Sequence, residues 1–185
     1  MSTPVRPGGT ALVLIDLQVD VLAPCGDVPG VLERTARLLA RARSSGVPVV
    51  HVQHSEEGLD PGTPGWQIAA PVRPVDGEPV VHKRYRDAFA GTDLTEVLAA
   101  AGADRLVVAG AQSDCCVRAT LHRAAVEGYD LTPVADCHTT TGQDAAGVHL
   151  TAEQVVAHCT ADIAGLRYPG RTIGVAPHDT VPLDA

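Results

Sequence analysis

The segment Arg105-Leu-Val-Val-Ala-Gly-Ala-Gln-Ser-Asp-Cys-Cys-Val-Arg-Ala-Thr120 decides the fold, because it passes from a strand through a turn into a helix. The aliphatic run from Leu106 to Ala109 predicts a buried strand, and Gly110 ends it. An amphipathic pattern then begins near Cys116 and stops at Gly128, which is a typical C-cap glycine. A strand followed at once by a helix is typical of a protein with a parallel sheet.

The remaining chain repeats this alternation of short aliphatic runs and helical patterns. Strands are predicted at Ala11 to Ile15, Val47 to Val52, Pro79 to His82, Leu106 to Ala109, Leu131 to Ala135 and, more weakly, Thr172 to Val175. Helices are predicted at Val31 to Ser45, Leu94 to Ala101, Val117 to Glu127 and Leu150 to Leu166, the last as the longest. The alternation predicts a three-layer α/β/α doubly wound sheet of about six mostly parallel strands. Without an internal repeat or a clear boundary, residues 1–185 are predicted to form one domain.

Composition narrows the class of partner. A formal net charge of −8 disfavours binding to nucleic acid or to an anionic membrane surface. No signal-peptide pattern or run of about 20 apolar residues is present in the sequence. The five cysteines are odd in number and irregularly spaced, which disfavours a disulfide framework or a zinc site. These features predict a cytoplasmic protein that acts on a small molecule.

Three reactive residues each follow a different predicted strand: Asp16, Lys83 and Cys116. The carboxyl ends of parallel strands meet at one edge of a sheet, so these side chains can come within hydrogen-bonding reach. A helix N-terminus and an ammonium group both favour a thiolate, and a carboxylate can accept and return a proton. The combination predicts acyl transfer, with attack on an amide carbonyl and hydrolysis of a thioester.

The same segments resemble the isochorismatase-like cysteine hydrolase superfamily, which includes nicotinamidases and N-carbamoylsarcosine amidohydrolases. The matching pieces are Leu14-Ile-Asp-Leu-Gln18, His82-Lys-Arg-Tyr-Arg-Asp-Ala-Phe-Ala-Gly-Thr-Asp-Leu94, Gly110-Ala-Gln-Ser-Asp-Cys-Cys-Val117 and Gly128-Tyr-Asp-Leu-Thr-Pro-Val-Ala-Asp136. Together they extend over about residues 10 to 166 in the order that the family has.

The resemblance implies a role for each matching residue. Asp16 matches the catalytic aspartate and Lys83 the catalytic lysine. Cys116 matches the nucleophile because it precedes Val, and Cys115 fills the variable position before it. The family also has a cis peptide before the nucleophile, here between Ala111 and Gln112, so that the backbone N–H groups of Gln112 and Cys116 would form the oxyanion hole.

Departures from the family pattern restrict the expected activity. The Asp-x-His metal motif of nicotinamidases is absent after the second strand, where this chain has His51-Val-Gln-His54, so no metal or other cofactor is predicted. Vinyl-ether hydrolases that act on isochorismate lack the nucleophilic cysteine, so Cys116 favours C–N hydrolysis. Val21 stands where many members have Phe, which predicts a changed pocket wall.

Five further residues are candidates for substrate binding: Gln18, His54, Trp66, Tyr85 and Phe89. Each has a simpler interpretation, such as loop structure for Gln18, a subunit contact for Trp66 and core packing for Phe89. Trp66 lies in the long Gly- and Pro-rich loop Ser55 to Asp76, which is typical of a binding loop or lid.

The sequence therefore predicts an amidohydrolase that cleaves an amide, ureido or lactam bond of a small molecule through a thioester. The resemblance implies a homodimer or homotetramer. Two alternatives stay open: a cysteine-independent vinyl-ether hydrolase, and a non-catalytic member that only binds a small molecule or a partner protein.

Overall fold

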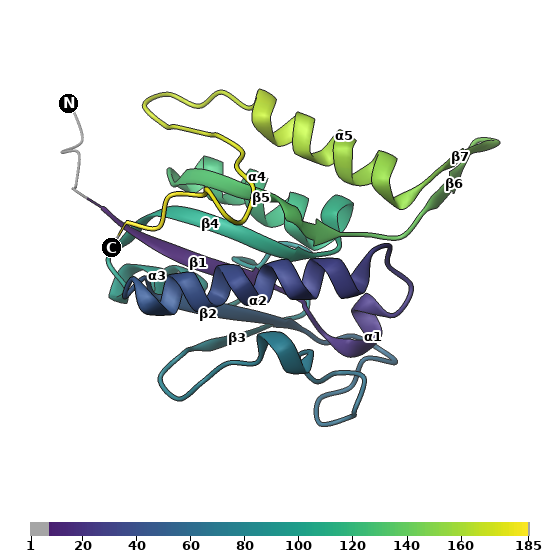
Figure 1. Cartoon of the computed structure of the whole chain (residues 1–185), viewed down its shortest axis with the longest axis horizontal. Coiled ribbons are helices and arrows are strands. Elements are labelled where there is room, and N and C mark those ends of the chain that lie inside the picture. Colours follow the sequence, from purple (N-terminus) through teal and green to yellow (C-terminus); the bar gives the residue numbers. More distant parts are fainter. Residues whose placement is uncertain (1–7, 185) are drawn as a thin grey trace.

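The computed structural model describes residues 8–184 and has a five-stranded parallel sheet at its centre (Figure 1). The strands are β1 (Gly9–Ile15), β2 (Val49–His54), β3 (Val80–Lys83), β4 (Ala103–Ala111) and β5 (Asp130–Thr139), in the spatial order β3-β2-β1-β4-β5. The reversal of strand order beside β1 is the topological switch point at which doubly wound proteins bind ligands. The predicted fold class is confirmed.

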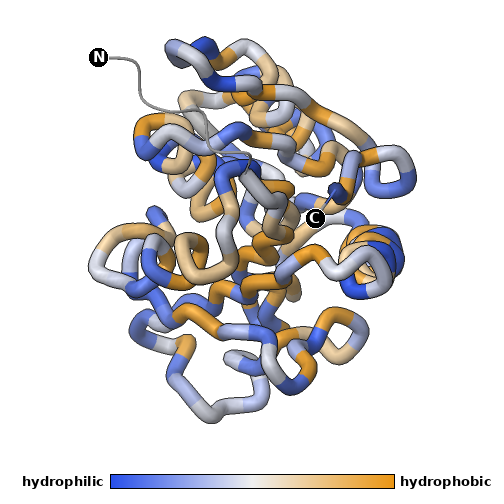
Figure 2. The backbone as a smooth tube through the Cα atoms, turned by 90° about the vertical axis from the view of Figure 1, so that its left-hand side faces the viewer, coloured by the Kyte–Doolittle hydropathy of each residue, from blue (hydrophilic) through white to orange (hydrophobic). Residues whose placement is uncertain are grey.

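Helices cover both faces of the sheet, which explains why its strands are almost continuously aliphatic. The helices are α1 (Val19–Leu22), α2 (Val28–Ser44), α3 (Leu94–Ala100), α4 (Arg118–Glu127) and α5 (Ala152–Gly165). Leu38 and Leu39 of α2 pack on one face, whereas Leu98 of α3 and Leu121 of α4 pack on the other. Figure 2 shows the hydrophobic positions along the strands inside the molecule and hydrophilic positions on the outer loops.

The predicted sixth strand is reduced to two isolated bridges against β5. Ile173 pairs with Leu131, and Ala176 pairs with Val134. Backbone N–H groups of β5 donate to this segment at Leu131 and Ala135. Pro133 lies midway between those donors and has no N–H, so the hydrogen bond that would join the two bridges is missing.

Two features of the predicted helices differ clearly from the structure. The longest helix is α2, with 17 residues, rather than α5, with 14. The helix expected near Cys116 is preceded by one π-helical turn, η2 (Ser113–Val117), and α4 begins at Arg118. A short antiparallel hairpin of β6 (Gln143–Ala145) and β7 (Val148–Leu150) was not predicted, and it projects from the body of the molecule before α5 (Figure 1).

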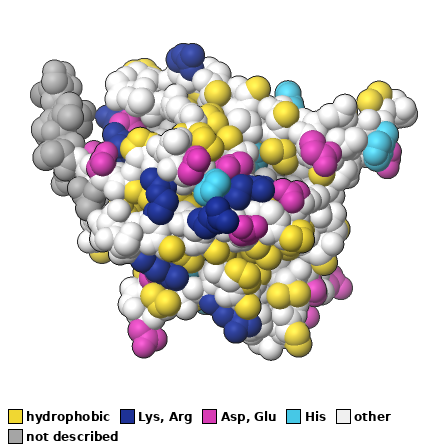
Figure 3. Space-filling model, in the orientation of Figure 1, with side chains coloured by type: hydrophobic (Ala, Val, Ile, Leu, Met, Phe, Trp, Pro, Cys, Tyr) yellow, Lys and Arg dark blue, Asp and Glu magenta, His cyan; other side chains and the backbone are white. Residues whose placement is uncertain are grey.

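Charged side chains over α2 are mixed in sign. Figure 3 shows basic, acidic and histidine side chains gathered on the face that α2 covers. Arg34 pairs with Asp27, and Arg37 pairs with Glu33. His178 pairs with Asp136 of β5. Neighbouring carboxylates therefore offset part of the positive charge of this face. Within residues 8–184, no helix is both long and apolar enough to cross a membrane.

Gly110 allows the end of β4 to approach β1. Its φ angle is +142°, and a Cβ atom at this position would lie 2.1 Å from the Ile15 carbonyl oxygen. Because that neighbour is backbone, we expect Gly110→Ala to lower the free energy of unfolding by about 3 kcal/mol. Urea unfolding followed by circular dichroism measures the loss. Gly174→Ala is the matched control, since a Cβ there meets nothing within 4 Å, and equal stability of the two variants would contradict the close approach.

Candidate active site

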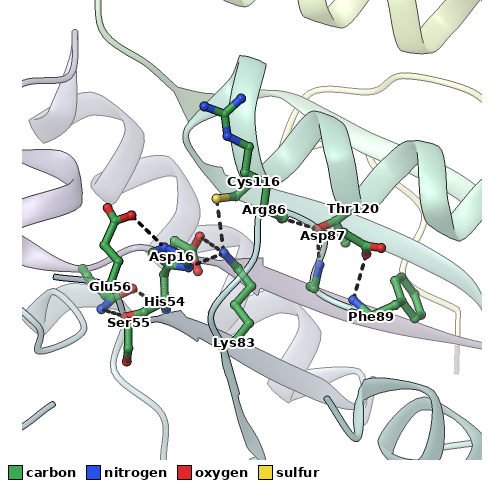
Figure 4. A network of polar contacts seen from close by, with 12 residues as sticks. Asp16, His54, Ser55, Glu56, Lys83, Arg86, Asp87, Phe89, Cys116 and Thr120 are labelled. Atoms are coloured by element: carbon green, nitrogen blue, oxygen red, sulfur yellow. Dashed lines mark hydrogen bonds and ion pairs between the residues drawn. The ribbon is translucent and has the colours of Figure 1, made fainter. Parts of the chain in front are cut away.

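Four polar side chains converge where neighbouring strands end. Asp16 follows β1, His54 and Lys83 are the last residues of β2 and β3, and Cys116 lies in η2 after β4. Figure 4 shows their side chains pointing toward one another. The Lys83 ammonium lies 2.6 Å from Asp16 Oδ2, 3.2 Å from Cys116 Sγ and 3.1 Å from His54 Nδ1. The structure thus brings together the three residues predicted to be catalytic, and it places His54, predicted to bind substrate, against Lys83.

The Lys83 side chain contacts residues at the ends of strands that are not adjacent to its own. Its strand, β3, is separated from β1 by β2, so the strand axes are roughly 10 Å apart. The long lysine side chain crosses the end of β2, and the three partners named above match the three donors of its ammonium group. Lys83 is only 2% exposed. Its ammonium group can be buried because all three of its donors have a partner.

His54 is held in place by the side chain of Gln18. The Gln18 amide accepts a hydrogen bond from the His54 N–H at 2.8 Å and donates to the His54 carbonyl at 3.0 Å. It also donates to the carbonyl of Trp66. Gln18 is completely buried, so it supports the site instead of facing a substrate. His54 Nδ1 accepts from Lys83, which places its proton on Nε2, 3.4 Å from Glu56.

Asp16 occupies a backbone conformation that few residues adopt. Its φ angle is +49°, in the left-handed region, where Asp is tolerated better than most residues with a side chain. Asp16 is almost fully buried, and its Oδ1 atom accepts no hydrogen bond from the described residues. Burial raises the pKa of its carboxyl group, although Lys83 opposes the increase. A buried carboxylate with a raised pKa is well suited to accept a proton.

The surroundings of the Cys116 thiol disfavour its ionisation. Burial, followed by the negative charge of Asp16, raises its pKa to about 12, and Lys83 only partly offsets this. The sequence-based expectation of a thiol pKa lowered by the helix and by Lys83 is therefore wrong in direction. It neglected the cost of burying an anion, which a sequence pattern does not reveal. A thiol of this kind needs a neighbouring base when it attacks.

The turn that carries Cys116 has the predicted backbone. The peptide bond between Ala111 and Gln112 is cis, as expected. One π-helical turn follows, a geometry that is frequent at functional sites. Gln112 and Cys116 both line the same cleft. Cys115 lines the cleft too, but its sulfur contacts the side chain of Asp114, at 3.9 Å, instead of Lys83.

The cleft has a volume of about 340 Å³, which suits a small molecule. Its lining consists of Asp16, Asp20, Val21, His54, Glu56, Leu59, Arg86, Gln112, Cys115 and Cys116. Val21, predicted to form a wall, is among them. Glu56, Leu59 and Arg86 were missed because they follow strand ends in loops, and Asp20 because it lies in the four-residue helix α1; segments of these kinds carry no periodic signal.

Of the five predicted substrate-binding residues only His54 lines this cleft, and the buried Gln18 and three others lie outside the lining. Trp66 donates from Nε1 to Ser55 and stacks on His82, with ring centroids 5.6 Å apart. Tyr85 is 64% exposed. Phe89 packs on the core and meets Tyr129 at 5.9 Å, which supports the simpler interpretation of packing. Only Glu56 and Leu59 of the long loop Ser55 to Asp76 reach the cleft.

One group of side chains within residues 8–184 could share a cation, and it lies outside the cleft lining. It comprises Asp136, Cys137 and His178. His178 Nδ1 is 2.6 Å from the Asp136 carboxylate, which Arg34 also approaches at 4.0 Å. Asp136 and His178 are therefore already satisfied by hydrogen bonds and charge pairing. Burial also raises the pKa of the Cys137 thiol to about 12.

Comparison with known proteins identifies the family to which this chain belongs. The isochorismatase domain model matches residues 10–164. A crystal structure of an isochorismatase from Pseudomonas putida KT2440 superposes with a TM-score of 0.86 at 30% identity, covering 98% of this chain and 94% of that chain. The chain belongs to the isochorismatase family and is a hydrolase of that family.

Several similar proteins are named for the hydrolysis of particular compounds. A streptothricin hydrolase from Streptomyces noursei is 37% identical over 175 residues, which cover 91% of this chain and 68% of that protein. A second streptothricin hydrolase from the same species matches at 41% identity but over only 49% of its length. A maleamate amidohydrolase from Pseudomonas putida is 32% identical over 69% of this chain and 70% of that protein.

Proposed function

We propose that this hydrolase cleaves a C–N bond of a small molecule, with Cys116 as nucleophile, Asp16 as proton acceptor and donor, and Lys83 as their electrostatic partner. The observation that carries the proposal is the contact of Lys83 Nζ with Asp16 Oδ2 at 2.6 Å and Cys116 Sγ at 3.2 Å. The names of the streptothricin and maleamate hydrolases support the choice of an amide-type bond.

The first half of the reaction forms a thioester. Asp16 takes the proton of the Cys116 thiol as the sulfur attacks the substrate carbonyl, so a C–S bond forms and the carbonyl electron pair moves to oxygen. The backbone N–H groups of Gln112 and Cys116 stabilise that oxyanion. When the electron pair returns, the C–N bond breaks, and Asp16 delivers its proton to the departing nitrogen as ammonia or an amine leaves.

The second half of the reaction consumes water. Asp16 takes a proton from water as its oxygen attacks the thioester carbonyl, and the oxyanion forms at the same donors. The C–S bond then breaks, the carboxylic acid leaves, and the sulfur recovers a proton from Asp16. Lys83 remains charged throughout and stabilises whichever partner, carboxylate or thiolate, carries the negative charge.

Two supporting residues give this constellation its geometry. His54 offers Nδ1 as a third acceptor to Lys83, and Gln18 fixes the backbone of His54. A cleft of about 340 Å³ accommodates a small amide, ureido or lactam compound, whereas a protein substrate would need an extended groove. A cytoplasmic setting and a homodimer or homotetramer belong to the same proposal, and the five free cysteines support a reducing environment.

A screen of small compounds tests the function. Primary amides, ureido acids and lactams are incubated with the protein, and released ammonia or amine is quantified. We expect release from members of the panel by the wild-type protein and none above background by Cys116→Ala. Turnover of isochorismate together with no C–N hydrolysis would favour the vinyl-ether alternative, and no turnover of either class would favour the binding-only alternative.

A further inference from the structure

A hydrogen-bond chain, buried at Ser113 and His138 and half-buried at Thr160, lies behind the turn that carries the nucleophile. Ser113, the first residue of η2, is 1% exposed, and its Oγ lies 2.8 Å from Nδ1 of His138 on β5. His138 Nε2 lies 3.1 Å from the hydroxyl of Thr160 on α5. None of these residues lines the cleft, so they make no contact with a substrate there.

The hydroxyl of Thr160 fixes the direction of every bond in this chain. Thr160 donates its only proton to the Val156 carbonyl at 2.8 Å, so it accepts from His138 Nε2. His138 therefore carries its proton on Nε2 and offers a lone pair on Nδ1. The Ser113 hydroxyl donates to that lone pair. Burial lowers the pKa of His138 to about 4, which agrees with a neutral ring.

This chain ties the turn to two elements outside it. Ser113 directly follows Gln112, whose N–H is one of the two oxyanion donors in the proposed mechanism. Its neighbour Asp114 is held as well, because Thr140 and Gln143 donate to its two carboxylate oxygens. A serine at the start of a helical turn commonly caps that turn with its own side chain. Here the Ser113 side chain is directed to β5 instead, so its bond fixes the position of the turn relative to the sheet.

From these contacts we propose that Ser113 and His138 are positioning residues that hold the oxyanion donors of Gln112 and Cys116 in place. The proposal rests on the cysteine mechanism above and adds residues that act through the backbone. Losing the bond between Ser113 and His138 leaves the thiol, Asp16 and Lys83 intact. It removes only the constraint on the backbone that receives the developing negative charge.

Two reagents separate this role from general loss of structure. The burst of p-nitrophenol from p-nitrophenyl acetate reports acylation of Cys116, which creates an oxyanion. Alkylation by iodoacetamide uses the same sulfur but creates no oxyanion. Both rates are measured in a Cys115→Ala background, so that Cys116 is the only thiol in the turn.

We expect Ser113→Ala and His138→Leu to slow acylation about 100-fold, as loss of one oxyanion donor does, while alkylation changes by less than about threefold. His138→Asn should recover most of the acylation rate, because Asn Oδ1 can accept from Ser113 where Nδ1 did. Cys159→Ala, a buried substitution on the same helix as Thr160, is the packing control and should leave the ratio of the two rates unchanged.

The possible contrary results differ in meaning. If acylation and alkylation fall together, or if neither changes, Ser113 and His138 do not position the oxyanion donors. If His138→Asn behaves like His138→Leu, the bond to Ser113 is not the cause. If the wild-type burst is absent or persists in Cys116→Ala, the proposed cysteine mechanism itself fails, and this inference fails with it.

Discussion

Replacing Cys116 by Ala is expected to reduce turnover by about 10⁴-fold or more, because the reaction then has no atom that can form the thioester. The thiol lines the cleft, and its sulfur contacts Lys83 at 3.2 Å. Steady-state rates on any substrate from the amide panel measure the loss. Acid-quenched wild-type reactions should also contain a thioester on the peptide that includes Cys116.

Cys115→Ala is the matched control, since it deletes the adjacent thiol in the same turn. Its sulfur meets the Asp114 carboxylate at 3.9 Å, so we expect turnover within about threefold of wild type. The reverse pattern, with Cys115 essential and Cys116 dispensable, would mean that Cys115 is the nucleophile and that the proposal names the wrong thiol. Unchanged turnover in both variants would exclude a thioester and favour a cysteine-independent hydrolase.

Much of this site could be predicted because strand ends are readable in sequence. Asp16, Lys83 and Cys116 each follow an aliphatic run, and parallel strands bring their carboxyl ends to one edge of the sheet. The spatial order of the strands could not be predicted in the same way from the sequence. That order places β2 between β1 and β3, so His54 lies under the lysine side chain and becomes a partner of Lys83.

Properties that depend on three-dimensional packing were the ones that sequence reasoning could not supply. Gln18 looked like a substrate contact because it is polar and close to Asp16 in the chain, yet it is buried against the backbone of His54. Trp66 looked like a pocket wall because it is a lone aromatic in a long loop, yet it turns toward Ser55 and His82. In each case the deciding partner is more than ten residues away, where no local pattern reports it.

Replacing Asp16 by Asn is expected to make the Cys116 thiol more acidic and, at the same time, to slow hydrolysis strongly. The negative charge of Asp16 is the second cause, after burial, of the raised thiol pKa of about 12. Removing it while Lys83 stays should move the pH midpoint of iodoacetamide alkylation at Cys116 down by roughly 1 to 3 pH units. Asn also tolerates the left-handed backbone at this position, so the substitution preserves the φ angle of +49°.

Turnover should nevertheless fall by about 10²- to 10⁴-fold, because an amide side chain accepts no proton from the thiol or from water. Lys83→Met should shift the pH midpoint of alkylation in the opposite direction. Without the cation beside the sulfur, the midpoint should rise above that of wild type. Turnover should fall in this variant as well. A normal turnover rate in Asp16→Asn would mean that Asp16 is not the proton acceptor and donor of the reaction. An unchanged midpoint in both variants would mean that neither charge acts on the sulfur, and the network of Asp16, Lys83 and Cys116 would then be no more than a buried ion pair beside a cysteine.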